Sequence, residues 1–282
     1  MGDNVNVNNI VVISDIHAGC KLGLCPSGLI PLDEGAGYNS SKLQQKAWKM
    51  WEEFWNIWVP RVTKGEKYVI VNNGDALDGV HHGSVTQISH NLTVQATVAK
   101  MILEPIIAKK NCVGYYHIRG TEAHVGKSGQ HEERLAKELG AVPNEFGQHA
   151  RWDMWARLHD RLVHFSHHVG ATGSSAYEST AVYKEMVEAF NEAGRWNDKP
   201  PDVCVRSHRH RQFEVRIATE NGYGISFVTP GWQLKTPFVY RLPSGRASTP
   251  QIGGYLIRHG NEDDVFTRFK VWKMGRSKEV VL

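Results

Sequence analysis

The sequence predicts an α/β fold. Apolar runs of strand length alternate with segments of helical periodicity through the first three-quarters of the chain, and short strands without that alternation follow. The 282 residues are 41% hydrophobic and 22% charged, a composition typical of a soluble globular protein with a large core. No repeat or linker-like tract interrupts the chain. We therefore expect one domain over residues 1–282, β-rich from about residue 212.

Charge and cysteine content limit the function classes. The net charge of +4 is mildly basic, which would accommodate a polyanionic partner without requiring one. The four cysteines form no Cys-x-x-Cys pair, as expected of reduced thiols in a cytosolic protein. Residues 1–6 lack the basic-then-apolar order of a signal peptide, and no apolar run approaches the roughly 18 residues that span a bilayer. These features predict a cytoplasmic protein that does not enter membranes.

Helices are expected where apolar residues recur at helical spacing. Ser41 and Gln44 form a capping-box pattern before such a segment at 43–58, and Pro60 should end it. A second helix is predicted at about 91–110, and Pro105 should kink it or split it in two. A third is predicted at 131–139, with Gly140 after its end, and a fourth at 182–190, closed by Gly194. The tryptophans at 48, 51, 55 and 58 could form a stacking platform, but their helical spacing favours a core position.

Strands are expected at the remaining apolar runs. The first group covers 11–13, 68–72, 114–118, 161–166 and 202–206, each bounded by polar or turn-forming residues. The second group covers 214–217, 225–229, 254–258 and 265–271, with no helix expected between them. A loop at 19–39 is too long for a simple connector, and such loops are often functional.

Acids and histidines follow the first group of strands. Ligands of α/β sheets bind at the carboxyl ends of strands, and residues two apart on a strand point to the same side. The candidates in order are Asp15 and His17, Asp75, Glu122 and His124, His167 or His168, and His208 and His210. Carboxylate mixed with imidazole suits Mn, Fe, Zn or Ni. About seven ligands fit two ions sharing a carboxylate better than one tetrahedral site, and two-metal sites support displacement at phosphorus.

These blocks together resemble the calcineurin-like metallophosphoesterases. The order Asp15-Ile16-His17, Gly74-Asp75-Ala76-Leu77-Asp78, Gly120-Thr121-Glu122-Ala123-His124, His167-His168 and His208-Arg209-His210 is similar to the motifs of that family. The resemblance implies a four-layer α-β-β-α sandwich of two mixed sheets, whose second sheet the strand-rich C-terminus would complete. The segments 74–87 and 229–238 also look like those of phosphoesterases from phages and prophages, which implies a bacterial or phage-infected cytosol.

The resemblance also implies roles for the ligands. Asp15, His17 and His210 would hold one metal, Asp75 would bridge both, and His208 with a strand-end histidine would hold the second. His167 is preferred to His168, which stays open, because the family's ligand comes directly after the strand. Asp78 would orient a ligand, or else merely pack a turn. Two divalent transition metal ions are expected, with manganese favoured.

The third block departs from the family pattern. The family has Gly-Asn-His there, with Asn as a metal ligand and His near the substrate, whereas here Thr121 takes the Asn position. We hypothesise that Glu122 replaces the Asn as a ligand and that His124 acts as the acid for the leaving group. Whether Glu122 or Thr121 replaces the Asn stays open.

The substrate is less well defined by the sequence. The arginines at 119, 206, 209 and 211 could grip phosphate oxygens, with Arg209 as a catalytic candidate, or could be structural. His81, His82 and Gln87 could line the cleft, and the stretch 229–238 could stack a base or form a packed turn. The predicted function is a binuclear phosphoesterase acting on a phosphodiester in DNA, RNA or a nucleotide. The alternatives are a phosphomonoesterase and a non-catalytic metal-binding scaffold, and the oligomeric state is undetermined.

Overall fold

The computed structural model of the chain describes residues 7–81, 83–171, 175–220, 222–242, 248–261, 264–275 and 278–282. His82 and the N-terminal residues 1–6, both used in the sequence predictions, lie outside the described residues. Within the described part, no helix combines the length and apolar character needed to cross a membrane.

The first sheet has six strands in the order β13-β12-β1-β4-β5-β6. Their bounds are β1 Asn9–Ile13, β4 Tyr68–Asn73, β5 Cys112–Ile118, β6 Ala150–Arg151, β12 Gln251–His259 and β13 Val265–Lys273. Strands β1, β4, β5 and β6 run parallel, so their carboxyl ends meet at one edge of the sheet. β12 pairs antiparallel with β1, and β13 pairs antiparallel with β12.

The second sheet has five strands in the order β10-β11-β9-β8-β7. Their bounds are β7 Asp153–Leu158, β8 Arg161–Ser166, β9 Val203–Arg206, β10 Phe213–Thr219 and β11 Gly222–Val228. β8 and β9 are parallel to each other, so their carboxyl ends also lie together. A separate hairpin, β2 (Leu29–Pro31) with β3 (Gly37–Asn39), occupies the long loop after β1.

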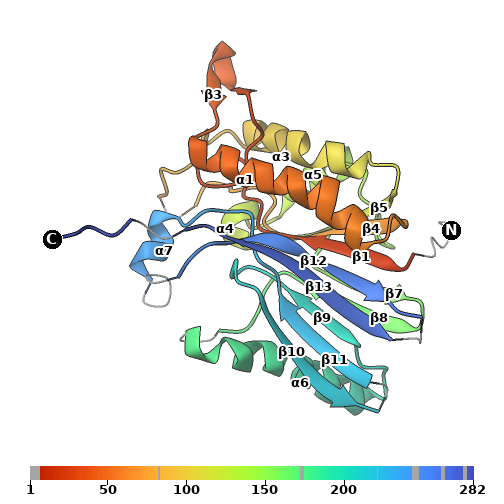
Figure 1. The fold of residues 1–282 in the computed structure, drawn as a ribbon. Helices are drawn as coiled ribbons and strands as arrows, with labels where there is room; N and C mark the ends of the chain where they lie inside the picture. The colour runs from red at the N-terminus through yellow and green to blue at the C-terminus, as the bar shows by residue number, and fades with distance from the viewer. Residues whose placement is uncertain are drawn as a thin grey trace.

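The two sheets pack face to face between helical layers, as Figure 1 shows. The outer face of the first sheet carries α1 (Lys42–Glu53), a π-helical turn (Phe54–Trp58), α2 (Val59–Val62), α3 (Leu92–Ile107) and α5 (Gln130–Glu138). α6 (Glu178–Trp196) packs on β10 and β11 of the second sheet. Val12, Val71, Phe165 and Phe227 belong to the apolar core between the sheets. The expected four-layer α-β-β-α arrangement is therefore confirmed.

The predicted helices are present, with different ends. Ser41 and Gln44 form the expected capping box, and three of the four stripe tryptophans are buried, so the core interpretation of the stripe is confirmed. Pro60 does not end the helix. The preceding turn is π-helical, with the Val59 N–H bonded to the Phe54 carbonyl five residues back, and Pro60 sits in the first turn of α2, where a missing N–H is tolerated.

Two further helix predictions are corrected in part, because α3 is not split and α6 does not close at Gly194. Pro105 lies in the last turn of α3 without splitting it. Gly194 lies inside α6, which ends instead at Asn197 in the left-handed conformation (φ 56°), a position that asparagine tolerates. Two short helices complete the inventory of the described residues: α4 (Glu122–Val125) and α7 (Pro237–Arg241), with three-residue 3₁₀ turns at Asp33–Gly35 and Ser175–Tyr177.

The C-terminal prediction was partly wrong. α7 lies between β11 and β12, where no helix was expected. The late strands also divide between the sheets: β10 and β11 complete the second sheet, whereas β12 and β13 extend the first. β12 joins the first sheet because its residues are buried on both faces and those at 255–258 pair with β1. β7, the antiparallel partner of β8, was not predicted at all.

Candidate metal centre

The two groups of parallel strands end at the same place. The loop after β1 lies against the loop after β4, because the Asp15 N–H donates to the Gly74 carbonyl at 2.9 Å and the His17 N–H to the Asp75 carbonyl at 3.0 Å. In the second sheet, the Ser207 N–H donates to the His167 carbonyl at 2.9 Å. The five strand ends identified from the sequence thus converge on one site.

Four groups of candidate ligands form there among the described residues. Two of them are His17, Asp75 and His124, and Asp78, His81 and His124. The other two lie next to each other, with 4.0 Å between Asp15 Oδ1 and His167 Nε2. The first is Asp15, His17 and His210, with 3.1 Å between Asp15 Oδ1 and His210 Nε2, and 3.2 Å between the Nε2 atoms of His17 and His210. The second is Asp75, His167 and His208, with Asp75 Oδ2 lying 3.0 Å from His167 Nε2 and 4.0 Å from His208 Nδ1. This grouping is the one that the family resemblance implies.

The ligand-bearing turns carry backbone strain. Asp15, His17, Asp75, His208 and His210 all have positive φ, between 47° and 73°. The left-handed region costs a non-glycine residue about 1–2 kcal/mol. Aspartate and histidine are among the residues found there most often, so the residue types suit both the chemistry and the conformation. Strain gathered in this way at one site is typical of functional centres.

A hydroxyl network joins the two sheets beneath Asp15. Ser14 Oγ–H donates to Asp15 Oδ2 at 2.5 Å and lies 2.6 Å from Thr229 Oγ1. Thr229 Oγ1 lies 2.8 Å from Ser207 Oγ, which accepts from Asn73 Nδ2 at 2.7 Å. All five residues are buried, so the network holds the turns after β1, β4 and β9 at fixed separation.

The structure places His167 rather than His168 in the cluster. His167 is buried, and its Nδ1–H donates to the Asn73 carbonyl at 2.7 Å, which directs Nε2 toward Asp75. Burial lowers the pKa of His167, but the Asp75 carboxylate outweighs burial and raises it. His168 is exposed and packs its ring against those of His167 and His208.

The residues fit a pair of divalent transition metal ions. Burial raises the pKa of both Asp15 and Asp75, but neighbouring imidazoles, His210 for Asp15 and His167 for Asp75, more than compensate and lower it. Both carboxylates are therefore anionic at neutral pH. Asp15 Oδ1 and His167 Nε2 are buried without a hydrogen bond, as expected of atoms meant to bind a cation. The mixed carboxylate and imidazole donors suit Mn, Fe, Zn or Ni.

Asp78 contacts His17, a candidate ligand, which is the position expected for one of its two predicted roles, that of orienting a ligand. Its Oδ1 lies 3.3 Å from His17 Nδ1, so His17 presents Nε2 to the cluster. Gln87 Nε2 donates to Asp78 Oδ2 at 2.8 Å, and Gln233 Nε2 donates to Oδ1 at 3.3 Å. Gln233 was not predicted individually, although it belongs to the stretch 229–238 that was suspected of walling the site.

Glu122 does not reach the cluster, which corrects its predicted role as a ligand. Its side chain is exposed at the first residue of α4, and Glu122 belongs to none of the candidate ligand groups. Thr121 occupies the place instead. Its N–H donates to Asp75 Oδ1 at 2.7 Å, and its Oγ1 lies 3.3 and 3.5 Å from the two Asp75 oxygens. Thr121 is thus the residue of this block that is positioned to coordinate.

His124 faces the cluster from the side of Asp75. Its Nδ1–H donates to the Asp78 carbonyl at 2.6 Å, and its Nε2 lies 3.8 Å from Asp75 Oδ2. Burial, followed by the neighbouring His17, lowers its pKa to about 4. His81 packs its ring against His124 at a centroid distance of 4.5 Å, so this loop histidine also belongs to the site.

The arginines beside the ligand turns bind protein groups. Their partners are Glu133 for Arg119 at 3.1 Å, Glu185 for Arg206 at 2.8 Å, and Glu178 for Arg211 at 3.0 Å. Arg209 donates to the Gly170 carbonyl and does not join the ligand groups. The structural alternative therefore describes Arg119, Arg206 and Arg211. Arg209 also has a buried Nη1 without a hydrogen bond, and its catalytic role stays a prediction.

Glu132 is a site residue that the sequence did not reveal. It is fully buried on α5, and its carboxylate accepts from the Ala76 N–H at 3.3 Å and from the Gly120 N–H at 2.8 Å. These two amides adjoin Asp75 and Thr121. A Cβ at Gly120 would lie 2.0 Å from Asp75 Oδ1, so only glycine allows this approach. Glu132 looked like one acid among several on a charged helix, and no local signal distinguished it.

Comparison with known proteins gives fold-level similarity. No protein-family model matches the chain, and no curated protein matches it. Among solved structures 48 chains match. One is a predicted phosphoesterase, a conserved uncharacterized protein of Streptococcus pneumoniae (8% identity, 94% of this chain and 98% of that chain, TM-score 0.36). Another is Chaetomium thermophilum Vps29 (8% identity, 95% of this chain and 99% of that chain, TM-score 0.40). A third is a Thermotoga maritima protein solved by NMR (8% identity, 95% of this chain and 100% of that chain, TM-score 0.34). At these values the likeness assigns no activity to this chain.

Proposed function

We propose that the chain is a calcineurin-like phosphoesterase that uses two divalent transition metal ions, with manganese favoured, to hydrolyse a phosphodiester in nucleic acid or a nucleotide. One observation carries the proposal. The group of Asp15, His17 and His210 lies beside the group of Asp75, His167 and His208 at the shared carboxyl edge of two sheets, in the order along the chain that this family uses.

Each residue has a defined task in this proposal. Asp15, His17 and His210 would hold one ion, and His167 and His208, with Thr121, would hold the other, with Asp75 shared. When bound, such a pair of ions supplies an activated water and neutralises charge on phosphate oxygens.

His124 is the proposed proton donor to the leaving oxygen. Its Nδ1–H is held by the Asp78 carbonyl, so donation requires a second proton on Nε2, which is directed toward the cluster. Because burial and His17 keep the ring neutral in the free site, the anionic substrate would have to raise the pKa of His124 before this proton can be transferred. A donor at this place should matter most for substrates whose leaving group is a poor one, because those leave as alkoxides unless protonated.

The preference for a diester rests on weaker support than the metal centre. The chain carries a net charge of +4, which suits a polyanionic substrate. The phage-like segments 74–87 and 229–238 suit a cytoplasmic protein of a bacterium or an infected host. The same residues would also serve a monoester, and the loss of the usual Asn at position 121 favours the alternative of a scaffold that binds metal without turnover.

The test compares two chromogenic esters. Hydrolysis of bis(p-nitrophenyl) phosphate and p-nitrophenyl phosphate is measured with added manganese for wild type, Asp75→Asn, and Asp153→Asn, an exposed acid outside the cluster. We expect diester turnover that Asp75→Asn abolishes and Asp153→Asn retains. Preference for the monoester would replace the diester assignment with a phosphomonoesterase. Bound metal without turnover of either ester would refute the enzymatic proposal.

A further inference from the structure

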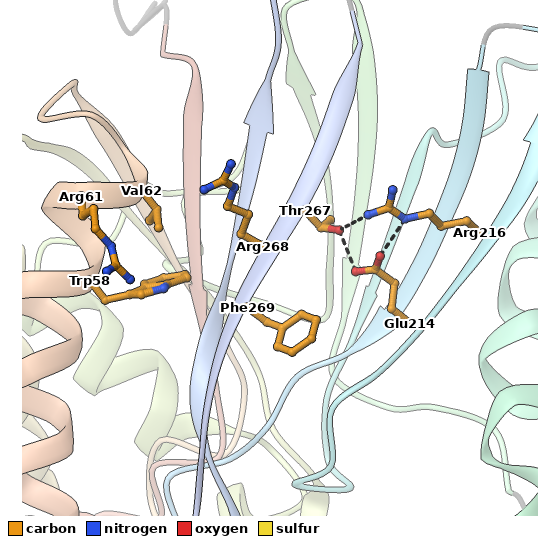
Figure 2. Close-up of a pocket in the computed structure, with 8 residues that line it drawn as sticks. All are labelled: Trp58, Arg61, Val62, Glu214, Arg216, Thr267, Arg268 and Phe269. Atoms are coloured by element: carbon orange, nitrogen blue, oxygen red, sulfur yellow. Dashed lines mark hydrogen bonds and ion pairs between the residues drawn. The ribbon is translucent and has the colours of Figure 1, made fainter.

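A second polar cavity lies away from the metal centre, at the open edge of the two sheets. It has a volume of about 460 Å³, within the range of ligand sites, and is lined by residues of the α2 region, β10 and β13. Figure 2 shows Arg61 on the helical side, Arg268 and Phe269 on β13, and Glu214 and Arg216 on β10. We call this feature the arginine groove.

The groove is separate from the metal centre. Thr267 of β13 pairs with Ile257, and Ile257 pairs with Ile10 of β1. Asp15 follows Ile10 by five residues, about 16 Å along the strand direction, and β13 lies two strands away from β1, about 10 Å more. β10 connects the two places, because it begins three residues after His210 and leads to Glu214 and Arg216.

The groove is electropositive. Glu214 is already engaged, since it accepts from Arg216 Nε at 2.9 Å and from Thr267 Oγ1 at 2.6 Å. Three arginines against this one glutamate leave two positive charges. Arg61 and Arg268 are exposed, and neither forms a hydrogen bond or ion pair with the residues that the structure describes. Their guanidinium groups are thus available to an anion.

The residue types indicate phosphates on a flexible strand. Edge strands often carry a cation against unwanted pairing, which accounts for Arg268 on β13 and Arg216 on β10 but not for Arg61 on the helical side of the same cavity. Guanidinium groups bind phosphate oxygens in paired hydrogen bonds. Phe269 is 48% exposed beside them and offers a ring on which a base can stack. An acidic peptide would use the arginines but not the ring.

We propose that the arginine groove binds the phosphates of a single-stranded stretch of the polynucleotide whose scissile bond lies at the metal centre. This inference rests on the proposed function, because it assumes a polymeric substrate. In this proposal Arg61 and Arg268 contribute to substrate binding and take no part in the hydrolysis step.

The test is binding as a function of salt. The variant Arg61→Gln/Arg268→Gln is compared with Lys184→Gln/Arg195→Gln, which removes the same charge from exposed positions on α6. Each pair is placed in an Asp75→Asn background, so that labelled oligo-dT and oligo-U stay intact during fluorescence anisotropy. Each lost phosphate contact lowers the slope of log K against log salt by about 0.7 for single strands. We expect the groove variant to lose about 1.4 in slope, roughly 25-fold in affinity at 0.1 M salt, and the α6 variant to lose far less.

Turnover separates this inference from the proposed function. With Asp75 intact, the groove variant should lose kcat/KM on oligonucleotides and keep wild-type rates on bis(p-nitrophenyl) phosphate. An unchanged slope and affinity, or equal losses in the α6 variant, would overturn the groove. Loss of oligonucleotide affinity without any diester turnover in the wild type would support the groove and refute the enzyme. The single variants Arg61→Gln and Arg268→Gln, each expected to lose about 0.7 in slope, keep the test decisive if the double variant folds poorly.

Discussion

Replacing Glu132 with glutamine tests whether this buried carboxylate positions the loops that carry the candidate metal ligands. The Glu132 carboxylate accepts backbone N–H groups from Ala76 and Gly120, the neighbours of Asp75 and Thr121. Glutamine keeps the size of the side chain but turns one acceptor oxygen into an NH₂ group. One of the two amides would then face a donor in a fully buried place, and its loop would have to shift.

The expected loss can be worked out from these contacts. A hydrogen bond to a charged group contributes about 1.5–3 kcal/mol to stability, and leaving a buried amide without an acceptor costs a similar amount. Glu132→Gln should therefore lower the free energy of unfolding by about 2–3 kcal/mol and the Tm by about 4–10 °C. Loss of groups that support ligands typically weakens metal binding 10–100-fold, and we expect at least tenfold weaker binding of one ion here.

Glu133→Gln is the matched control on the same helix. Glu133 also accepts two backbone amides, from His149 and Ala150 at 2.8 Å each, but these fasten β6 and not the metal loops. Thermal unfolding and isothermal titration with manganese are measured for both variants. Both should lose stability, and Glu132→Gln alone should lose metal affinity. Equal metal affinity in the two variants would refute the positioning role and leave Glu132 a structural residue.

The remaining predictions concern single sites. Gly120→Ala should abolish activity, because its Cβ would lie 2.0 Å from Asp75 Oδ1. Gly194→Ala, in open space within α6, should be neutral or slightly stabilising. Activity and Tm are measured for both variants to distinguish a local effect at the site from a general loss of stability. Thr121→Val should weaken binding of the second proposed metal ion, whereas Glu122→Gln should not. The metal content per chain is measured for both variants. A lower metal content in Glu122→Gln would restore Glu122 as a ligand. The hydrogen bond from Arg258, outweighing burial, lowers the pKa of Glu66 from 4.5 to about 2. The ionised Glu66 carboxylate therefore stabilises the fold above pH 4.5, and this contribution is lost as the pH falls toward 2. The difference in unfolding free energy between wild type and Glu66→Gln, measured by urea unfolding, should shrink over that range. An equal difference at pH 6 and pH 2 would contradict this.

Local sequence signals identified most of the candidate ligands that the structure brings together, because each of them sits directly after a buried strand. Asp15 and Asp75 could be placed from the apolar runs that precede them, and His208 and His210 from their spacing. His167 was separated from His168 only by the tertiary structure, since Nε2 contact with Asp75 depends on the ring's bond to the Asn73 carbonyl. The sequence also could not predict whether Thr121 or Glu122 approaches Asp75, because this depends on the residue at which α4 begins.

The sequence by itself determined the α/β class, the strand–helix alternation that places β1, β4, β5, β8 and β9, and the residue types of a carboxylate–imidazole centre, because periodicity and strand-end composition are local properties of the chain. Only the tertiary structure decided which sheet each late strand joins, that Thr121 and not Glu122 approaches Asp75, and that Glu132 holds both loops. These outcomes depend on contacts between segments far apart in the chain. Nothing within a single segment distinguishes a buried acceptor of two distant amides from an ordinary acid on a helix.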